Sequence, residues 1–127
     1  MKIGFMNVRT LGGQFVKSDG GVRETRNDLR KLPLFLHEFG RLDLQVIAVA
    51  ESRTTEKEYS MEGYKCFFSG KEDHQSGVGI LVCDKWAERV ARIERINECI
   101  MWVAGKFDGV DMAVIVAYAP CLDKGMR

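Results

Sequence analysis

Three polar side chains stand at the ends of three apolar segments of the sequence. Asn7 lies near the end of the first segment, Glu51 directly follows the second, and Tyr118 precedes Ala119-Pro120 at the end of the third. Open α/β sheets bind ligands at the carboxyl ends of their strands. A carboxylate there must be solvated, hydrogen-bonded or bound to a cation. An amide both donates and accepts hydrogen bonds, and a buried phenol needs a partner for its hydroxyl.

Each of these residues also has a simpler structural interpretation. Glu51 could be a solvated residue at a strand end, or could form an ion pair with Arg53. Asn7 could be a turn-forming residue, and the partner of the Tyr118 hydroxyl need not be a substrate. The three side chains are more informative together than singly, and together they indicate a polar site at one end of a sheet.

Other candidates for chemistry are weaker. His74 lies in a predicted turn and could contact a ligand, whereas His37 lies in a predicted helix beside Glu38 and is expected at the surface. These two histidines support no nucleophilic triad. Two basic clusters could contact phosphates or could simply be solvated faces. They are Arg26-Arg30-Lys31 and Arg89-Arg92-Arg95.

The elements that must position these residues begin with a strand, a helix and a second strand. Residues 2–8 form a short apolar segment typical of a buried strand. Leucine and phenylalanine recur at steps of three and four residues from about Glu24 to Phe39, which predicts a helix kinked or restarted at Pro33 and ended by Gly40. The apolar run 44–50 predicts a strand covered on both faces.

The remainder reads mainly as strands. The Asp108-Gly109 pair between two apolar segments is the strongest hairpin signal in the chain. Gly77 and Gly79 suggest a bend or a close approach of another backbone. The stretch 84–91 fits either a helical turn or an irregular strand, with an extended stretch leading into a hairpin as the preferred alternative. Further strands are predicted at 64–69, 77–82, 99–107 and 110–118, and loops at 9–22, 52–58 and 71–76.

Composition indicates one folded domain over residues 1–127. The chain has 46% hydrophobic and 29% charged residues, which argues against disorder. Its 19 Lys and Arg and 18 Asp and Glu leave a net charge of +1, so a strongly basic nucleic-acid binder is excluded while a local basic patch is not. No apolar run reaches the roughly 20 residues of a membrane span. The N-terminus is a poor signal peptide. We therefore expect a soluble intracellular protein of the nucleus or cytoplasm, with no membrane partner.

Four cysteines are spaced by 17, 16 and 22 positions and form no Cys-x-x-Cys pair. Structural zinc sites usually take two ligands from one turn. The spacing therefore favours small buried hydrophobic residues over a zinc site or disulfides. The order of elements predicts an α/β or α+β fold, with a mixed sheet covered by a helix.

Four segments in this order resemble the N-terminal half of the endonuclease/exonuclease/phosphatase superfamily. The resemblance is strongest to the endonuclease domain of non-LTR retrotransposons and to craniofacial development protein 2-like proteins. The segments are Met6-Asn7-Val8-Arg9-Thr10-Leu11, Val46-Ile47-Ala48-Val49-Ala50-Glu51-Ser52-Arg53, Gly77-Val78-Gly79-Ile80-Leu81-Val82 and Val116-Ala117-Tyr118-Ala119-Pro120. The resemblance implies one half of a four-layer α/β sandwich with a mixed, mostly antiparallel sheet.

The resemblance also implies roles for particular residues. Glu51 would be the ligand of Mg²⁺ or Mn²⁺, Asn7 would position the reactive phosphate, and Tyr118 would contact that phosphate. Arg9, Arg53 and His74 are further possible phosphate contacts. A hard divalent cation prefers carboxylate oxygen, keeps several waters and can polarise a phosphoryl group for in-line hydrolysis. The implied substrate is DNA.

The sequence also departs from the family. Met6 stands where a Trp is usual, and Arg9 stands where repair-type members often carry Asp, although Arg resembles the retrotransposon branch. The family's second half, with Gly-Asp-x-Asn and Ser-Asp-His motifs, is not represented. These motifs supply the group that activates water and an Asp/His pair, and proton handling is worth roughly 10²–10⁴-fold in rate. We therefore expect a truncated Mg²⁺-dependent endonuclease-like domain with weak or no activity.

Two alternatives remain open at this stage. One is a non-catalytic half-domain that acts through self-association or protein interaction, as a homodimer formed through an exposed sheet face. The other is a relative of small-molecule or phosphoinositide phosphatases, which the Asn-Val-Arg-Thr-Leu segment makes less favourable.

Overall fold

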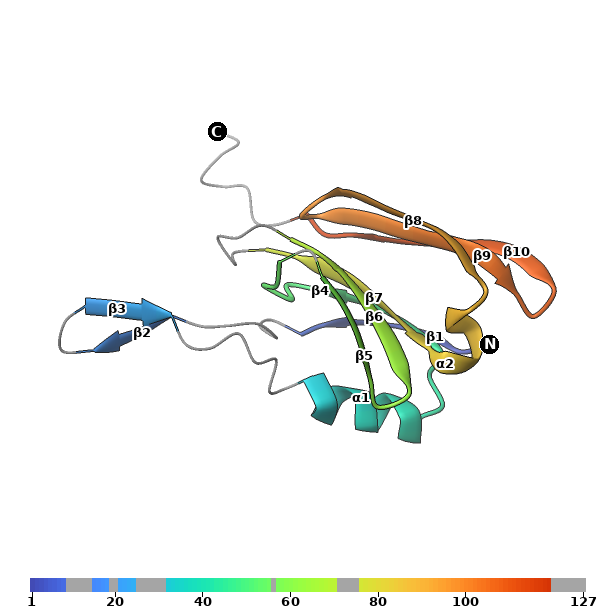
Figure 1. The fold of residues 1–127 in the computed structure, drawn as a ribbon, viewed down its shortest axis with the longest axis horizontal. Helices are drawn as coiled ribbons and strands as arrows, with labels where there is room; N and C mark the ends of the chain where they lie inside the picture. Colours follow the sequence, from blue (N-terminus) through green and yellow to red (C-terminus); the bar gives the residue numbers. More distant parts are fainter. Residues whose placement is uncertain (9–14, 19–20, 25–31, 56, 71–75, 120–127) are drawn as a thin grey trace.

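A ten-residue helix and two β-sheets are stacked as three layers in the computed structural model of the protein (Figure 1). The structure describes residues 1–8, 15–18, 21–24, 32–55, 57–70 and 76–119. These residues form an α+β fold made mostly of strands, as the order of elements predicts. Within this part of the chain, no helix is long and apolar enough to cross a membrane.

The central layer, called here the inner sheet, has five strands. Their order is β1 (Ile3–Asn7), β4 (Val46–Ala50), β7 (Val78–Cys83), β6 (Tyr64–Ser69) and β5 (Lys57–Met61). Only β1 and β4 are parallel among these neighbours, and the chain crosses between them through α1 (Leu32–Arg41). The other three pairs are antiparallel, so the inner sheet is mixed and mostly antiparallel, as expected.

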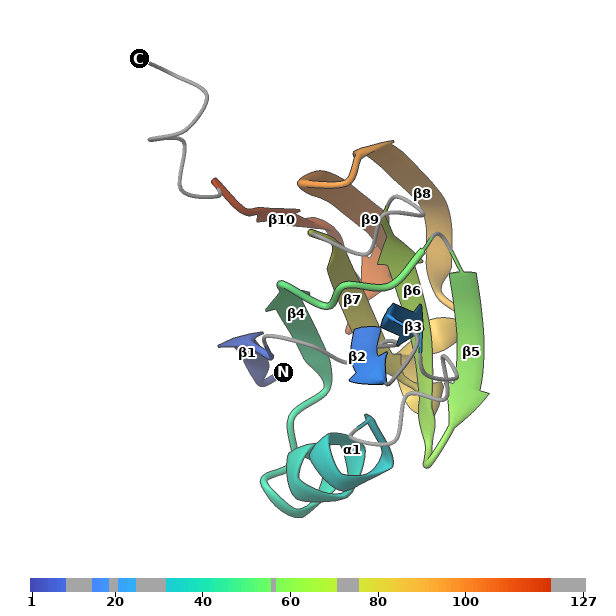
Figure 2. The ribbon, with the colours of Figure 1, turned by 90° about the vertical axis from the view of Figure 1, so that its left-hand side faces the viewer.

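A second sheet, called here the outer sheet, covers the face of the inner sheet opposite α1 (Figure 2). It consists of β10 (Val110–Ala117), β9 (Ile100–Phe107) and β8 (Val90–Asn97), all antiparallel. A short helix, α2 (Asp84–Ala87), leads from β7 into β8. A separate hairpin joins β2 (Phe15–Ser18) and β3 (Gly21–Glu24).

Strand β4 lies in the middle of the protein and is buried along its whole length. Ile47 and Val49 face the core beneath α1, whereas Val46 and Ala48 face the core between the two sheets. Because successive side chains of a strand point to opposite faces, a strand between two apolar layers must be apolar at every position. The prediction of a strand covered on both faces is confirmed.

Helix α1 begins later than predicted. It starts at Leu32, and Glu24 belongs to β3, so the start expected at about Glu24 is wrong, whereas a helix that begins beside Pro33 is close to the restart expected there. Pro33 is the second helical residue, where a backbone N–H has no partner within the helix and a proline is tolerated. Leu32, Leu36 and Phe39 form the buried face, as their spacing predicts, and the helix ends at Arg41, one residue after Gly40.

Two tight turns define the antiparallel hairpins. Asp108 and Gly109 have φ angles of 55° and 79°, and Glu62 and Gly63 have φ angles of 52° and 82°. Positive φ at both central residues is typical of the type I′ turn, whose twist matches that of the flanking strands. The hairpin predicted at Asp108-Gly109 is confirmed, and the second turn joins β5 to β6.

Two expected loops contain strands instead. The stretch 9–22 includes β2 and the start of β3, and β5 begins within the stretch 52–58. These strands are only four or five residues long and contain several polar residues, so they carry little hydrophobic periodicity. The ambiguous stretch 84–91 is divided between the two alternatives: residues 84–87 form a short helix, and β8 then begins at Val90 and leads into a hairpin, as preferred. The turn expected at 71–76 lies mostly outside the described residues.

The cysteine prediction is confirmed in part. Cys66 is fully buried, while Cys83 and Cys99 are half-buried. Cys121 lies outside the described residues. The resemblance implies one exposed sheet face, without saying which; both faces of the inner sheet are covered, one by α1 and the other by the outer sheet. The uncovered face of the described part is the far side of the outer sheet (Figure 1).

Candidate functional site

The ends of β1 and β4 lie side by side at one edge of the inner sheet. Asn7, the last residue of β1, is the register partner of Ala50, the last residue of β4. The backbone N–H of Val8 donates to the carbonyl of Ala50 at 3.0 Å and extends this pairing by one residue. Register partners project to the same face, so Asn7 points to the side of the outer sheet, where it is exposed. Glu51 follows Ala50 directly.

Tyr118 reaches the same place from the outer sheet. Its hydroxyl donates a hydrogen bond to Oε1 of Glu51, and both side chains are half-buried. The backbone N–H of Tyr118 donates to the carbonyl of Cys99 at 2.9 Å and holds the residue beside the β8–β9 turn. A carboxylate from one sheet and a phenol from the other are therefore joined, although 67 positions separate them in the sequence.

The backbone that carries Glu51 has an uncommon conformation. Glu51 and Arg53 have φ angles of 56° and 54°, in the left-handed region that non-glycine residues seldom adopt. Such residues cost of order 1–3 kcal/mol each and persist only where the surroundings determine them. They cluster at functional sites. Asp43, Glu62 and Asp108 have the same conformation in turns elsewhere in the chain, so the φ angles show a tightly held loop and do not by themselves assign it a role.

Buried contacts hold this loop in place. Ser52 and Thr54 are fully buried, and their hydroxyl oxygens lie 3.2 Å apart. The N–H of Ser52 donates to the carbonyl of Gly77 at 3.1 Å. A Cβ atom at Gly77 would lie 2.7 Å from Oγ of Ser52, and one at Gly70 would lie 1.8 Å from the carbonyl oxygen of Thr54. Both glycines are needed so that the loop can approach the inner sheet.

Sequence reasoning anticipated only part of this support. The close approach of another backbone is confirmed at Gly77, where a Cβ would lie 3.1 Å from the backbone nitrogen of Arg53. At Gly79 the close neighbour is a side chain instead: a Cβ would lie 2.6 Å from the Phe68 ring. The roles of Ser52, Thr54 and Gly70 were missed. The sequence does show two small hydroxyl residues, Ser52 and Thr54, soon after Glu51. Such residues occur in buried loops and in solvated loops alike, so this pattern did not predict their burial.

The structure describes only some of the remaining candidate residues. Arg53 is an exposed residue of the same loop, whereas Arg9 and His74 lie outside the described residues, as does the Arg26-Arg30-Lys31 cluster. His37 is exposed on α1, as expected. In the second basic cluster, Arg95 has a structural role: its Nε donates to the carbonyl of Phe68 at 2.9 Å, and its guanidinium lies 3.5 Å from Glu58.

The donor set suits a cation held mainly by solvent and substrate. Glu51 supplies one carboxylate, and no group of three His, Cys, Asp or Glu residues that could hold a metal exists among the described residues. Mg²⁺ usually keeps several waters and is bound through one or two carboxylates together with substrate phosphate. The site fits that mode of binding, and it does not fit a cage built from protein ligands alone.

Comparison of the sequence with known protein families and with curated proteins finds no match.

Proposed function

We propose that this chain carries part of a metal-dependent phosphodiesterase site of the endonuclease/exonuclease/phosphatase type. The single observation that supports the proposal best is the hydrogen bond between Tyr118 and Glu51 beside Asn7. The three side chains named from the sequence come from the ends of three strands in two different sheets: Tyr118 contacts Glu51, and Asn7 ends the strand next to the one that Glu51 follows. Pairing of β1 with β4 places Asn7 beside the Glu51 loop, and the bond from Tyr118 brings in the end of a third strand from the other sheet.

Each side chain has a physical role in this proposal. Glu51 would hold Mg²⁺ or Mn²⁺ through its carboxylate, and the cation would supply charge that polarises a phosphoryl oxygen when bound. The Tyr118 hydroxyl orients the carboxylate by donating to Oε1. It could instead donate to a phosphate oxygen once a substrate is present. The exposed amide of Asn7 could position the phosphate from the neighbouring strand end, and DNA is the proposed substrate.

We expect this site to hydrolyse phosphodiesters weakly or not at all in the isolated chain. A carboxylate, an amide and a phenol provide cation binding and phosphate contact, but none of the three is suited to activate water while bound as proposed. General acid–base catalysis is worth roughly 10²–10⁴-fold, which is the loss expected without it. In the proposed family, a four-layer sandwich would supply the missing groups from its second half.

Metal binding tests the proposal more directly than activity does. We predict that the chain increases the relaxation rate of solvent protons in the presence of Mn²⁺, and that Glu51→Gln abolishes this effect by removing the charged ligand. The matched control is Glu88→Gln, at an exposed residue after α2 in a different part of the chain. Equal Mn²⁺ binding by both variants, or no binding by the native chain, would contradict the proposed metal site.

A plasmid-nicking assay in Mg²⁺ tests the expected weakness of the activity. Cleavage close to background is the predicted result. Strong cleavage that disappears in Glu51→Gln would confirm the site but show that the expected inactivity is wrong. Strong cleavage that persists in Glu51→Gln would point to a contaminating nuclease or to another site.

Self-association is a second candidate function, and one structural observation favours it. The outward face of the outer sheet has no covering layer among the residues described, and it carries exposed apolar side chains. Faces of this kind often mark interaction sites.

A further inference from the structure

The outward face of the outer sheet combines two adjacent rows of very different side chains. One row contains Ala113 on β10, Ala104 on β9 and Arg92 on β8, which are register partners. The next row along the strands contains Ile115, Trp102 and Glu94, which are register partners in the same way. Because residues two apart in a strand share a face, both rows project outward.

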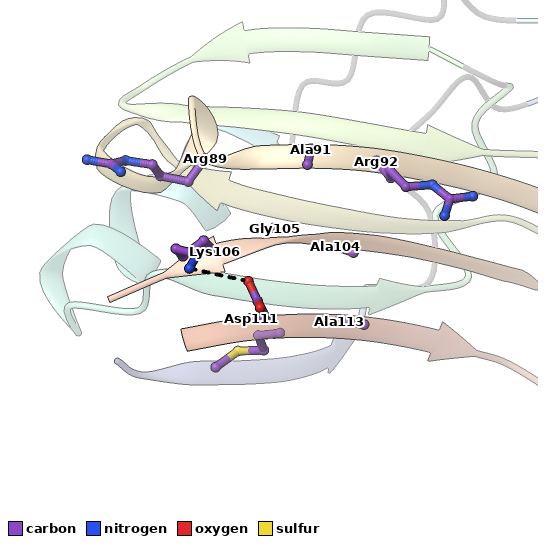
Figure 3. Close-up of a pocket in the computed structure, with 9 residues that line it drawn as sticks. Arg89, Ala91, Arg92, Ala104, Gly105, Lys106, Asp111 and Ala113 are labelled. Atoms are coloured by element: carbon purple, nitrogen blue, oxygen red, sulfur yellow. Dashed lines mark ion pairs between the residues drawn. The ribbon is translucent and has the colours of Figure 1, made fainter. Parts of the chain in front are cut away.

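The first row lies in a hollow of the surface (Figure 3). A shallow hollow of about 640 Å³ lies over it, with a floor that includes Ala91, Ala104 and Ala113. Arg89, Arg92 and Lys106 border the hollow, and Lys106 is 3.8 Å from Asp111. The hollow exists because Ala113 and Ala104 are register partners on β10 and β9, and Ala91 lies next to them at the irregularity between Val90 and Arg92 of β8.

The second row protrudes. Ile115 is 64% exposed, which is unusual for an isoleucine in the middle of an eight-residue strand. Trp102 lies beside it, with the guanidinium of Arg92 5.3 Å from the centre of its ring. The hollow and the protrusion are therefore one row apart on the same face.

Consider a two-fold axis that lies between two stacked copies of the outer sheet, perpendicular to the strands and midway between the two rows. Rotation about this axis would place the first row of each copy opposite the second row of the other. In two sheets packed face to face about this axis, Ala113 faces Ile115 of the second copy and Ala104 faces its Trp102. Arg92 likewise faces Glu94 of the second copy. Small residues meet large ones, and the symmetry applies every pairing twice. Arg92 lies 3.6 Å from Glu94 of its own chain, so the axis would bring two such ion pairs together with each cation facing the anion of the other copy. A contact through the same patch on both copies is the commonest kind of protein dimer interface.

We infer that two copies of this chain associate through the outward faces of their outer sheets, with Ile115 of each copy seated in the alanine-floored hollow of the other. The inference develops the second candidate function and does not depend on the phosphodiester site. Sheets packed face to face lie about 10 Å apart, which leaves room for one interdigitated layer of side chains.

Sedimentation velocity over a range of concentrations measures this association. The native chain is expected to change from monomer to dimer as concentration rises. Ile115→Ser should weaken the dimer by at least about tenfold, because it removes a buried isoleucine from each copy. The matched control is Leu34→Ser on α1, where the leucine is 72% exposed and faces away from this surface. This control should dimerise like the native chain.

A charge exchange tests the two-fold arrangement itself. In the proposed dimer, position 92 of each copy faces position 94 of the other. Arg92→Glu therefore places an acid opposite Glu94 in both contacts, and Glu94→Arg places a base opposite Arg92 in both contacts. Each variant alone should be monomeric. An equimolar mixture should form a heterodimer, because each acidic pair then faces a basic pair. Loss of folding cannot produce this recovery, since two unfolded variants would not restore each other.

Three results would overturn the inference. The first is a native chain that stays monomeric at high micromolar concentration. The second is a mixture of the charge variants that stays monomeric. The third is a dimer that survives Ile115→Ser but is lost in Phe5→Lys, which would place the contact at the exposed edge of β1. Glu51→Gln should dimerise normally, so failure of the metal site and failure of this interface are distinguishable.

Discussion

At the scale of single residues, Gly70 determines whether the loop that carries Glu51 can reach its position. A Cβ atom there would lie 1.8 Å from the carbonyl oxygen of Thr54, a main-chain atom that cannot rotate away. Gly70→Ala is therefore expected to lower the free energy of unfolding by about 1–3 kcal/mol, the usual cost of overpacking. It should also displace Glu51 from Tyr118. Urea unfolding measures the first effect, and Mn²⁺ binding measures the second.

Gly40→Ala is the matched control for this substitution. Gly40 lies in α1, and a Cβ atom added there would meet no neighbour within 4 Å, so alanine gains helix propensity without a clash. It should raise stability by roughly 0.5–1 kcal/mol. Equal effects of the two substitutions would show that the approach of Thr54 to Gly70 is not a constraint on this loop.

At the scale of elements, the two type I′ turns set the register of the hairpins that they join. Gly109 has a φ of 79°, and a Cβ there would meet no neighbour within 4 Å. The cost of Gly109→Ala is therefore purely conformational. We predict a loss of about 1–2 kcal/mol in urea unfolding, the penalty for placing a Cβ in the left-handed region. Gly63→Ala should cost a similar amount, since its φ of 82° and open surroundings are nearly the same.

A large difference between the two glycine variants would contradict this account. It would mean that contacts outside the turns, and not the φ angle, determine the cost. Gly40→Ala serves again as the control for the generic effect of an added methyl group, because Gly40 has a helical backbone.

The elements that the sequence predicted well are those buried by apolar neighbours. Strand β4 is apolar throughout because both of its faces are covered, and that pattern is unambiguous. Strand β5 has an exposed and half-exposed pattern, with only Tyr59 and Met61 packed against the core, so its sequence carries a weaker signal than that of β4. The start of α1 was misplaced at Glu24 because the start of a helix is set by caps and tertiary contacts, which periodicity does not reveal.

The same distinction applies to the candidate site. Asn7, Glu51 and Tyr118 were identifiable because each ends an apolar segment. The bond between Glu51 and Tyr118 was not predictable from that pattern, since it depends on how the outer sheet packs against the inner one. The supporting glycine, Gly70, was missed because a close approach between backbones leaves no periodic signal.

At the scale of the whole molecule, the core beneath α1 contains a thiol and a phenol that resist ionisation. Burial raises the pKa of Cys66 to about 12, with a further contribution from Asp84. Burial also raises the pKa of Tyr64, assisted by Cys83 and Asp43, and the neutral hydroxyl donates to the carbonyl of Leu44. Both groups are therefore held in their neutral forms in the native protein.

This arrangement predicts a loss of stability in alkali. The Cys66 thiol has a pKa near 9.0 in the unfolded chain, so between pH 9 and 12 the unfolded chain loses a proton that the native protein keeps. Ionisation then favours unfolding, and the free energy of unfolding falls by up to about 1.4 kcal/mol for each pH unit. Below pH 9 the thiol is neutral in both states, and its contribution is constant. Tyr64 acts in the same direction above its ordinary value of 10.0.

Urea unfolding between pH 7 and 11 measures this dependence, and Cys66→Ala should make the decline above pH 9 shallower. Val49→Ala, in the same core cluster, is the matched control: it removes buried carbon without removing a titratable group. It should lower stability by a similar amount at every pH and leave the slope unchanged. Since Tyr64 remains in both variants, part of the decline should persist above pH 10. An unchanged slope in Cys66→Ala would show that the buried thiol does not control the response of the fold to alkali.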